Sequence, residues 1–202
     1  MAIAPRVGCL AVDCKRLAFR VSSYKIHKKG NMSTNYFFDT EFIEDGKTID
    51  LISIGIVCED GRELYLCNSE CEFWRASEWV WENVLSTLVK KSHTNLESRF
   101  IDPELWHVKA AIKAAILDFC KDTKPKFWAY YADYDWVVFC QLFGTMMDLP
   151  DGFPMYCRDI KQYCDDLGNP DLPKQGKGEH NALADARWNK TAYEFLRSVE
   201  KG

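Results

Sequence analysis

Two carboxylates separated by one residue come directly after the first clearly apolar run of the chain. Asp39 and Glu41 follow Tyr36-Phe37-Phe38, a run typical of a buried β-strand. In an extended chain, residues i and i+2 point to the same face, so both carboxylates should project together from the end of this strand. Such close like charges repel unless a cation neutralises them, and oxygen clusters suit Mg²⁺ or Mn²⁺. A solvated turn is the alternative, because the polar residues 44–46 follow at once.

A third carboxylate, Asp135, is expected on the inner face of a helix. Val138, Phe139 and Leu142 follow it at the spacing of one helical face. A carboxylate at a packed position needs a partner, which a bound metal ion would provide; a structural role is the alternative. Asp133 is expected to precede the helix, where it would cap the N-terminus or complement the helix dipole.

A histidine and a fourth carboxylate mark the start of the last predicted helix. Asp185 precedes Trp188 by three residues, which places it on the side that carries the apolar stripe. His180 comes five residues earlier, after the glycine-containing stretch 176–179, and is expected on a loop at the same end. An isolated histidine is more often a surface or capping group, so the spacing to Asp185 is what indicates a base.

The rest of the pattern supplies elements that would position these residues. Apolar runs predict four strands, the first three linked as hairpins: 35–39, 49–58, 63–67 and 127–130. Helical spacing predicts five helices: 77–89, 104–120, 135–146, 158–167 and 182–199. Three strands followed by alternating helices and strands indicate an α/β fold, with a mixed β-sheet flanked by helices.

Taken in order, the motifs resemble those of the DEDDh exonucleases of the ribonuclease H-like superfamily: Asp-x-Glu, then Tyr-Asp on a helix, then His-x4-Asp. The stretch Phe38-Asp-Thr-Glu-Phe-Ile-Glu-Asp-Gly46, followed by Leu51-Ile-Ser-Ile-Gly-Ile-Val57, looks like the ribonuclease AS group. The resemblance covers residues 32–196. Its specificity comes from the three motifs together, because Asp-x-Glu alone is common by chance. It implies a ribonuclease H-like sheet that begins with three antiparallel strands.

The resemblance also implies a function, that of a metal-dependent 3′→5′ exoribonuclease acting on the 3′ end of single-stranded RNA. Two divalent cations, Mg²⁺ or Mn²⁺, would be held by four carboxylates: Asp39, Glu41, Asp135 and Asp185. His180 would take the proton of the attacking water. A preference for adenylate and a homodimer are implied as well. A 3′→5′ DNA exonuclease of the same fold and a catalytically silent binding module are the alternatives.

Two residues beside these motifs are candidates for binding RNA. Phe42 could stack on the terminal base, or could be a core residue. Lys177, with Lys174 in the same approach to His180, could steady the phosphate backbone, or could simply be solvated. Five of the seven tryptophans lie mostly within predicted elements and are expected in the core: Trp79, Trp81, Trp106, Trp128 and Trp188.

Composition sets the limits of this interpretation. The 202 residues, 47% of them hydrophobic, are enough for one globular domain, predicted to span 32–202. No apolar run approaches the length of a membrane span, so we expect a soluble protein. The nine cysteines include no CxxC pair, and no secretory signal is visible. Reduced thiols in a cytoplasmic protein are therefore expected.

Residues 1–31 are predicted to lie outside the domain as a basic extension. Residues 1–33 carry seven Lys/Arg and one Asp, whereas the remainder carries 19 basic and 29 acidic residues. Three explanations are open: a start codon called too early, a disordered extension and a targeting leader. The acidic remainder would bind nucleic acid poorly by charge alone, because such binding depends on Lys and Arg. Bound metal ions would supply the positive charge locally.

Overall fold

Three consecutive antiparallel strands begin the sheet of this computed structural model, which describes residues 32–90, 100–176 and 178–202. They are β1 (Met32–Glu44), β2 (Ile49–Cys58) and β3 (Glu63–Asn68). β2 and β3 match their predictions closely. β1 is longer than predicted, because it pairs with β2 as far as Glu44. Asp39 and Glu41 therefore lie within the strand, neither at its end nor in a solvated turn.

Three further strands complete a six-stranded sheet. They are β4 (Trp106–His107), β5 (Thr123–Ala129) and β6 (Arg158–Asp159). The strand order is β4-β3-β2-β1-β5-β6, and the pairs β1–β5, β3–β4 and β5–β6 are parallel. The predicted mixed sheet is confirmed.

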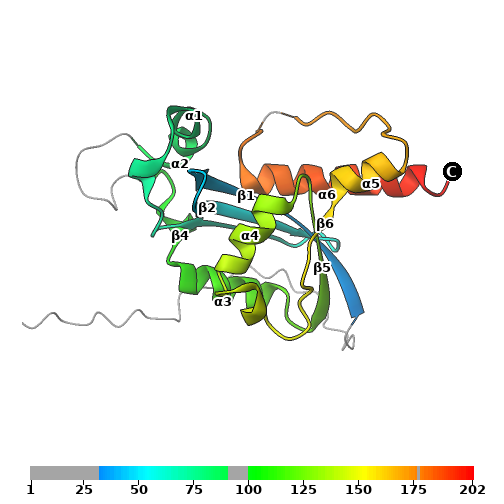
Figure 1. The fold of residues 1–202 in the computed structure, drawn as a ribbon, viewed down its shortest axis with the longest axis horizontal. Coiled ribbons are helices and arrows are strands. Elements are labelled where there is room, and N and C mark those ends of the chain that lie inside the picture. Colours follow the sequence, from blue (N-terminus) through cyan, green and yellow to red (C-terminus); the bar gives the residue numbers. More distant parts are fainter. Residues whose placement is uncertain (1–31, 91–99, 177) are drawn as a thin grey trace, which may run out of the picture.

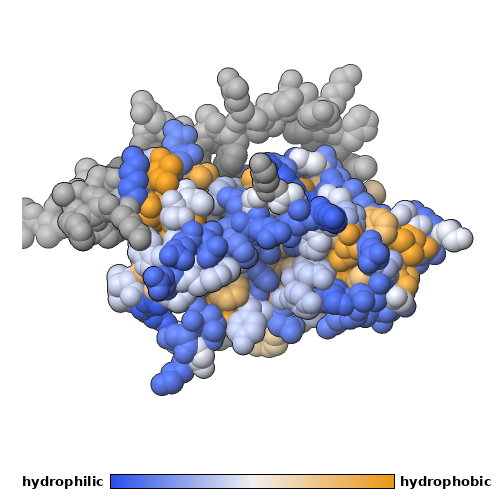
Figure 2. All heavy atoms as spheres, turned by 90° about the horizontal axis from the view of Figure 1, so that it is seen from above, coloured by the Kyte–Doolittle hydropathy of each residue, from blue (hydrophilic) through white to orange (hydrophobic). Residues whose placement is uncertain are grey.

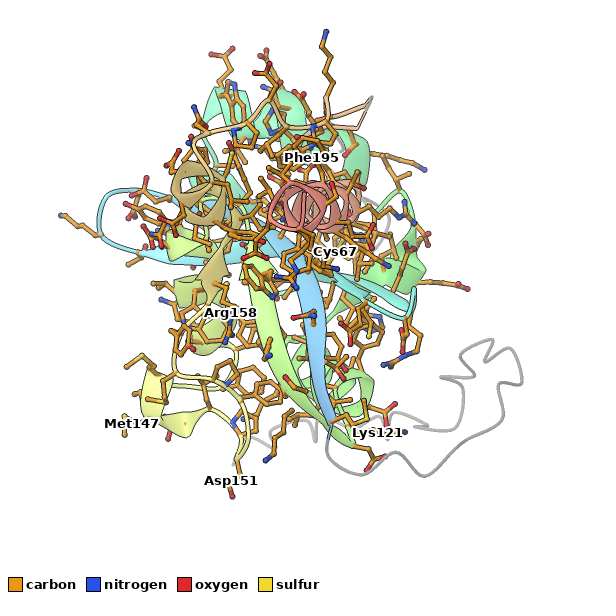
Figure 3. All side chains as sticks on the ribbon, turned by 90° about the vertical axis from the view of Figure 1, so that its right-hand side faces the viewer. Cys67, Lys121, Met147, Asp151, Arg158 and Phe195 are labelled. Carbon is orange, nitrogen blue, oxygen red and sulfur yellow. The ribbon has the colours of Figure 1, made fainter. Side chains whose placement is uncertain are left out.

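Helices cover both faces of this sheet (Figure 1). One face carries α3 (Lys109–Phe119) and α4 (Asp133–Gln141), and the other carries α5 (Ile160–Asp166) and α6 (Ala182–Val199). The alternation of β1 separates two cores: Tyr36 and Phe38 pack with α3 and α4, whereas Phe37 packs with α5 and α6. Figure 3 shows α6 end-on over the sheet, with Phe195 on this helix.

The predicted helix over 77–89 is a helical segment with an irregular middle. It consists of α1 (Glu78–Val80), a π-helical turn (Trp81–Leu85) and α2 (Ser86–Leu88). The Ser77 side chain caps it by accepting a hydrogen bond from the Val80 N–H at 3.2 Å. Val84, Leu85 and Leu88 are buried in a third core beneath it. Figure 1 places α1 beside the start of α6.

Two helices begin later in the chain than predicted. The helix expected from residue 104 begins at Lys109, because Pro103–Leu105 forms a 3₁₀ turn and Trp106–His107 pairs with β3 as β4. The helix expected from residue 158 begins at Ile160, after the short strand β6. Asp159 caps this helix, since its Oδ1 accepts from the Gln162 N–H at 2.9 Å.

The helix α4 differs from its prediction at both ends. It begins at Asp133, so this residue lies in the first turn, where it complements the dipole; the N-cap residue is Ala132. It ends at Gln141 instead of 146, because Gly144 takes a positive φ of 128° and a 3₁₀ turn follows, capped by Thr145.

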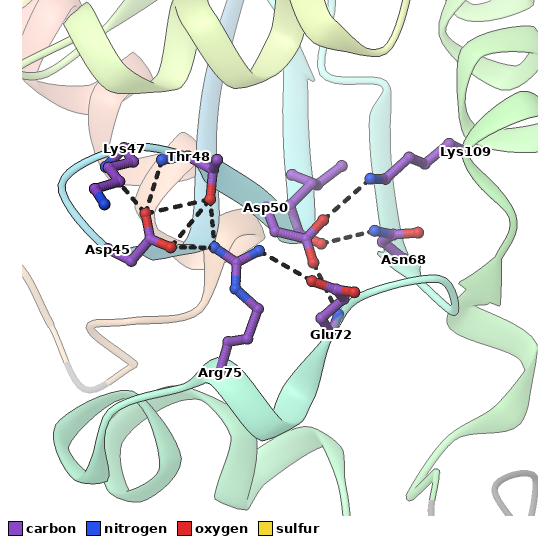
Figure 4. A network of polar contacts seen from close by, with 9 residues as sticks. Asp45, Lys47, Thr48, Asp50, Asn68, Glu72, Arg75 and Lys109 are labelled. Carbon is purple, nitrogen blue, oxygen red and sulfur yellow. Dashed lines mark hydrogen bonds and ion pairs between the residues drawn. The ribbon is translucent and has the colours of Figure 1, made fainter.

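A polar network ties the β1–β2 turn to the segment that leads into α1 (Figure 4). Arg75 forms ion pairs with Asp45 of this turn at 2.5 Å and with Glu72 at 3.1 Å. The buried Asp50 accepts from the Glu72 N–H at 2.8 Å and pairs with Lys109 of α3 at 3.0 Å. These contacts fix the position of α1 relative to β1.

The surface over the middle of α6 is mainly hydrophilic (Figure 2). Before its last residue, Val199, the exposed positions of this helix are polar: Arg187, Thr191, Glu194 and Ser198. Across the described segments, no helix combines the length and apolar character needed to cross a membrane. The seven cysteines described there are free, and six of them are buried. The predictions for residues 1–31 and for Lys177 lie outside the described residues.

Candidate active site

The first two carboxylates lie side by side on β1, next to an irregularity in its pairing with β2. Asp39 pairs with Gly55 and Glu41 with Ser53, but the next residue, Phe42, pairs with Leu51. Ile52 therefore has no partner in β1. Such β-bulges bend a strand and re-aim its side chains, and they are frequent beside active sites.

A glycine allows the last helix to come close to these carboxylates. A Cβ atom on Gly55 would lie 2.3 Å from the carbonyl oxygen of Ala182, the first residue of α6. Only a residue without a side chain fits, so the start of α6 rests directly on β2 opposite Asp39. Farther along the helix, the buried Asn189 donates to the carbonyl oxygen of Phe38 at 2.9 Å.

This approach places Asp185 with Asp39 and Glu41. The three side chains each offer one carboxylate oxygen, and these oxygens all lie within 4.8 Å of one another. Asp185 also accepts from the backbone N–H of His180 at 3.0 Å and from the Gln175 side chain. The fold therefore brings these three carboxylates together, as predicted. The contact between Asp185 and Gln175 was not predicted from the sequence.

The fourth predicted ligand, Asp135, lies on α4 and is 7% exposed, as expected for the inner face. Its Oδ1 accepts from the N–H and the hydroxyl of Thr40 at 2.8 and 2.6 Å. Asp135 is not in the group of three clustered oxygens. Its charge nevertheless raises the pKa of both Asp39 and Glu41, so it is electrostatically part of the same site.

Burial raises the pKa of all four carboxyl groups, and repulsion from the neighbouring carboxylates of the site adds to it for Asp39 and Glu41. Desolvation is the largest cause for each; it raises the pKa of Glu41 to about 8 and those of Asp135 and Asp185 to about 6. Asp39 is raised well above its usual pKa, and the neighbouring carboxylates add to the effect of burial.

No described Lys or Arg forms an ion pair with Asp39, Glu41 or Asp185. Carboxylates held together in this way are stable only when protonated or when they bind a cation. An all-oxygen donor set fits the hard cations Mg²⁺ and Mn²⁺. The residues present therefore fit a divalent metal site.

His180 lies at the same end of the molecule, as predicted. Its φ of 66° is in the left-handed region, which non-glycine residues rarely adopt. The ring of His180 lies edge-to-face with the ring of Trp79, with centroids 4.8 Å apart and planes at 80°. His180 and the acidic cluster line the same cavity, so an imidazole and the candidate metal ligands face the same space.

This cavity has a volume of about 430 Å³ and a mixed lining. Asp39, Glu41, His180 and Asp185 are among its polar residues, and four apolar side chains also line it: Phe42, Trp79, Val80 and Val84. A second cavity of about 190 Å³ adjoins Asp39, Gln175 and His180. With cations bound to the carboxylates, such a lining suits a ligand that carries both a phosphate and a flat base.

The structure describes one of the two candidate RNA-binding residues, Phe42. Phe42 is half-buried, lines the cavity and stacks on Tyr134, with ring centroids 6.0 Å apart. It is therefore available to a base at this cavity. Lys174 is exposed, and Lys177 lies outside the described residues.

The expectation that the tryptophans are in the core is wrong for Trp79. Trp106 is buried, and Trp81, Trp128 and Trp188 are partly buried, but Trp79 is 53% exposed. A signal for this was present in the sequence: Val80, Val84 and Leu88 form the apolar stripe, and Trp79 is not on it.

Comparisons with known sequences find exoribonuclease relatives. The pattern of the 3′-5′ exoribonuclease Rv2179c-like domain matches residues 34–196. The chain is 37% identical over 168 residues to the 3′-5′ exoribonuclease Rv2179c of Mycobacterium tuberculosis strain ATCC 25618 / H37Rv. It is equally similar to the 3′-5′ exoribonuclease MT2234.1 of strain CDC 1551 / Oshkosh. Both alignments cover 82% of this chain and 94% of the relative.

Solved structures of exonuclease I share the fold. The apo form has a TM-score of 0.56 at 14% identity, covering 83% of this chain and 42% of that one. The complex of the Escherichia coli protein with a 5cy-dT13 oligonucleotide has a TM-score of 0.54 at 14% identity, covering 85% and 41%. The chain thus spans about two fifths of those proteins, and the likeness concerns the fold alone. It confirms the predicted ribonuclease H-like α/β architecture.

Proposed function

Because this chain belongs to the Rv2179c-like 3′-5′ exoribonuclease domain family, we propose that it hydrolyses single-stranded RNA from the 3′ end at the cluster of Asp39, Glu41 and Asp185. The observation that carries the proposal is the grouping of three carboxylate oxygens within 4.8 Å on one side of a cavity that His180 also lines. A binding module without catalysis would not require buried carboxylates that repel one another. Family membership also makes the chain a phosphodiester hydrolase.

The metal ligands follow from the same arrangement. Asp39, Glu41 and Asp185 would hold divalent cations, and we propose two of them, Mg²⁺ or Mn²⁺. Asp135 would join as the fourth ligand: the two hydrogen bonds from Thr40 both end on its Oδ1, which leaves Oδ2 outside that pair of bonds. The bound cations would lower the pKa of water and neutralise charge on the phosphate.

His180 would act as the general base. A neutral imidazole nitrogen can accept a proton from the attacking water, provided that the ring is held near it. The backbone supports that position, since the His180 N–H donates to Asp185, a proposed metal ligand. The loop carrying the base and the helix carrying the ligand are thereby joined.

Phe42 would contact the terminal base, because it lines the same cavity as the acidic cluster. Base–aromatic stacking contributes roughly 1–3 kcal/mol per base. The resemblance of the residues 38–57 to the ribonuclease AS group supports two narrower proposals, a preference for adenylate and a homodimer. Light scattering coupled to size-exclusion chromatography tests the second, and a monomeric mass would contradict it.

A time course of hydrolysis tests the proposed function. The protein is incubated in Mg²⁺, Mn²⁺ or EDTA with oligonucleotides labelled at the 5′ end. These are oligoribonucleotides and matched oligodeoxyribonucleotides, each of A-only and of mixed sequence. We expect a metal-dependent ladder that shortens from the 3′ end on RNA, faster for the A-only strand. Equal or faster loss of DNA would favour the 3′→5′ DNA exonuclease, since the choice depends on contacts to the 2′-hydroxyl. No cleavage in either metal would favour the binding module.

A further inference from the structure

Trp79 is exposed although the segment that carries it is firmly anchored. Trp79 is 53% exposed, whereas Val84 and Leu85, a turn farther along, are almost completely buried. Ser77 caps the start of the segment, and the network around Arg75 holds the residues before it. The exposure is therefore a feature of a fixed helix, and it leaves a large aromatic ring facing the cavity of the acidic cluster.

The ring of Trp79 contacts the ring of the proposed base at the lining of this cavity. His180 is about one hundred residues away in the sequence, yet the two ring centroids lie 4.8 Å apart with planes at 80°. Edge-to-face contacts of this kind are directional, because the positive edge of one ring faces the negative face of the other. The contact consequently restrains the orientation of the imidazole as well as its distance.

Two independent supports thus act on His180. Its backbone N–H is held by Asp185, and its side chain contacts Trp79. The contact with Trp79 matters because the hydrogen bond to Asp185 holds the backbone N–H of His180, which leaves the torsion angles of its side chain unrestrained by that bond. A general base works only within hydrogen-bond reach of the proton it takes.

We propose that Trp79 is a positioning residue that holds the imidazole of His180 toward the acidic cluster. This inference rests on the proposed function, in which His180 is the base. Trp79 then acts on the rate of hydrolysis through His180, and the binding of RNA does not require it. In the alternative, the exposed ring of Trp79 is a stacking surface for a base. RNA binding would then require Trp79, and the experiments below distinguish the two roles.

The first experiment detects the contact in the metal-free protein without any activity measurement. NMR spectra of protein labelled in its four histidines are recorded for the wild type and for Trp79→Leu, with His180→Ala to assign the signal. Because an indole ring shifts the resonances of nearby protons, Trp79→Leu should move the His180 ring signals and leave those of His107 in place. Unchanged His180 signals would overturn the inference.

The second experiment separates rate from binding. Single-turnover cleavage of RNA should slow by roughly 10- to 100-fold in Trp79→Leu, since misplacing a catalytic group costs about that much. Trp79→Phe should stay within about threefold of the wild type, because phenylalanine can make the same edge-to-face contact. Trp74→Leu is the control: Trp74 is 78% exposed and does not line the cavity, so its rate should not change.

RNA binding is compared in proteins that lack the base. His180→Ala and the double variant Trp79→Leu/His180→Ala should bind a 5′-labelled oligoribonucleotide in Mg²⁺ with the same Kd. A weaker Kd in the double variant, by a factor matching the rate loss, would identify Trp79 as a base-stacking surface and overturn the positioning role. A wild-type rate in Trp79→Leu would also overturn it. If the wild type cleaves no RNA, the proposed function fails, whereas the NMR comparison still decides whether the contact exists.

Discussion

Gly55 and Ala182 touch at the point where the last helix meets the sheet: a Cβ atom on Gly55 would lie 2.3 Å from the Ala182 carbonyl oxygen. Gly55 is also the β2 partner of Asp39. The absence of one side chain therefore sets the distance between the helix that carries Asp185 and the strand that carries Asp39.

Gly55→Ala should separate these two elements. The added methyl group meets backbone atoms, which cannot rotate away, so we expect a loss of about 1–3 kcal/mol in the free energy of unfolding. Activity should fall by roughly tenfold or more, because the carboxylates no longer meet at the same distance. Urea unfolding and RNA hydrolysis measure the two effects. Gly176→Ala is the control, since its added Cβ meets nothing within 4 Å; equal effects of both substitutions would contradict the argument.

Asp185→Asn should abolish hydrolysis and leave the fold intact. The substitution removes the charge with almost no change in volume, and it weakens metal binding. In the wild type, a metal concentration one hundred times the Kd should stabilise the folded state by about 2.7 kcal/mol. Thermal unfolding with Mn²⁺ and with EDTA should show this gain in the wild type and a reduced gain in the variant. Asp171→Asn, at an exposed position, is the control. Retained hydrolysis in Asp185→Asn would remove Asp185 from the site.

The strands β1, β2, β3 and β5, the helix α6 and the burial of Asp135 could be predicted, because each depends on a local pattern. Apolar runs predicted β2 and β3, and an apolar stripe at helical spacing predicted α6 with its bounds. Asp135 was correctly assigned to a packed face from the three apolar residues that follow it. These features need no knowledge of which distant segments meet.

What could not be predicted depends on contacts between distant segments. The extension of β1 through Glu44 follows from its pairing with β2, and the late start of α3 follows from the pairing of Trp106 with Cys67. The Trp79–His180 contact likewise arises only after α1 and α6 are placed on the same sheet. The periodicity of apolar residues carries no information on contacts between distant segments.

Thr40→Val should weaken the site without removing a proposed ligand. The Thr40 hydroxyl donates to Asp135 Oδ1 at 2.6 Å, and this bond lowers the pKa of Asp135 against the effect of burial. Its loss should raise that pKa and the Mg²⁺ concentration needed for half-maximal activity, and should cost about 1 kcal/mol of stability. Thr40→Ser keeps the hydroxyl and should behave as the wild type. A metal requirement unchanged by Thr40→Val would show that this bond does not tune Asp135.

A chain beginning at Met32 should retain full activity. The prediction follows from the first strand, which starts at Met32 and pairs with β5 from its first residue. The specific activity and the thermal unfolding of the full-length and shortened chains can be compared directly. Insolubility or lost activity of the shortened chain would mean that residues 1–31 contribute to the domain.

Without metal, the folded protein should lose stability as the pH rises from about 5 to about 8. In the folded state the pKa of Glu41 is raised to about 8 and those of Asp135 and Asp185 to about 6, compared with 4.5 and 3.8 for the free groups. Between these values the folded chain binds more protons than the unfolded chain. By linkage, the free energy of unfolding is greatest at a pH below the pKa values of the unfolded chain. It decreases as the pH rises through the pKa values of the folded chain.

Bound metal should reverse this dependence, because cations replace the protons that neutralise the cluster. Melting temperatures in EDTA should therefore decrease across this pH range, whereas those in Mn²⁺ should rise or stay level. Asp185→Asn removes one of the repelling charges, so its decrease in EDTA should be smaller than that of the wild type. The carboxyls with lowered pKa, such as those of Glu63 and Asp148, titrate below this range and do not oppose the effect. A melting temperature in EDTA that rises from about pH 5 to about pH 8 would contradict the raised pKa values on which the metal site is argued.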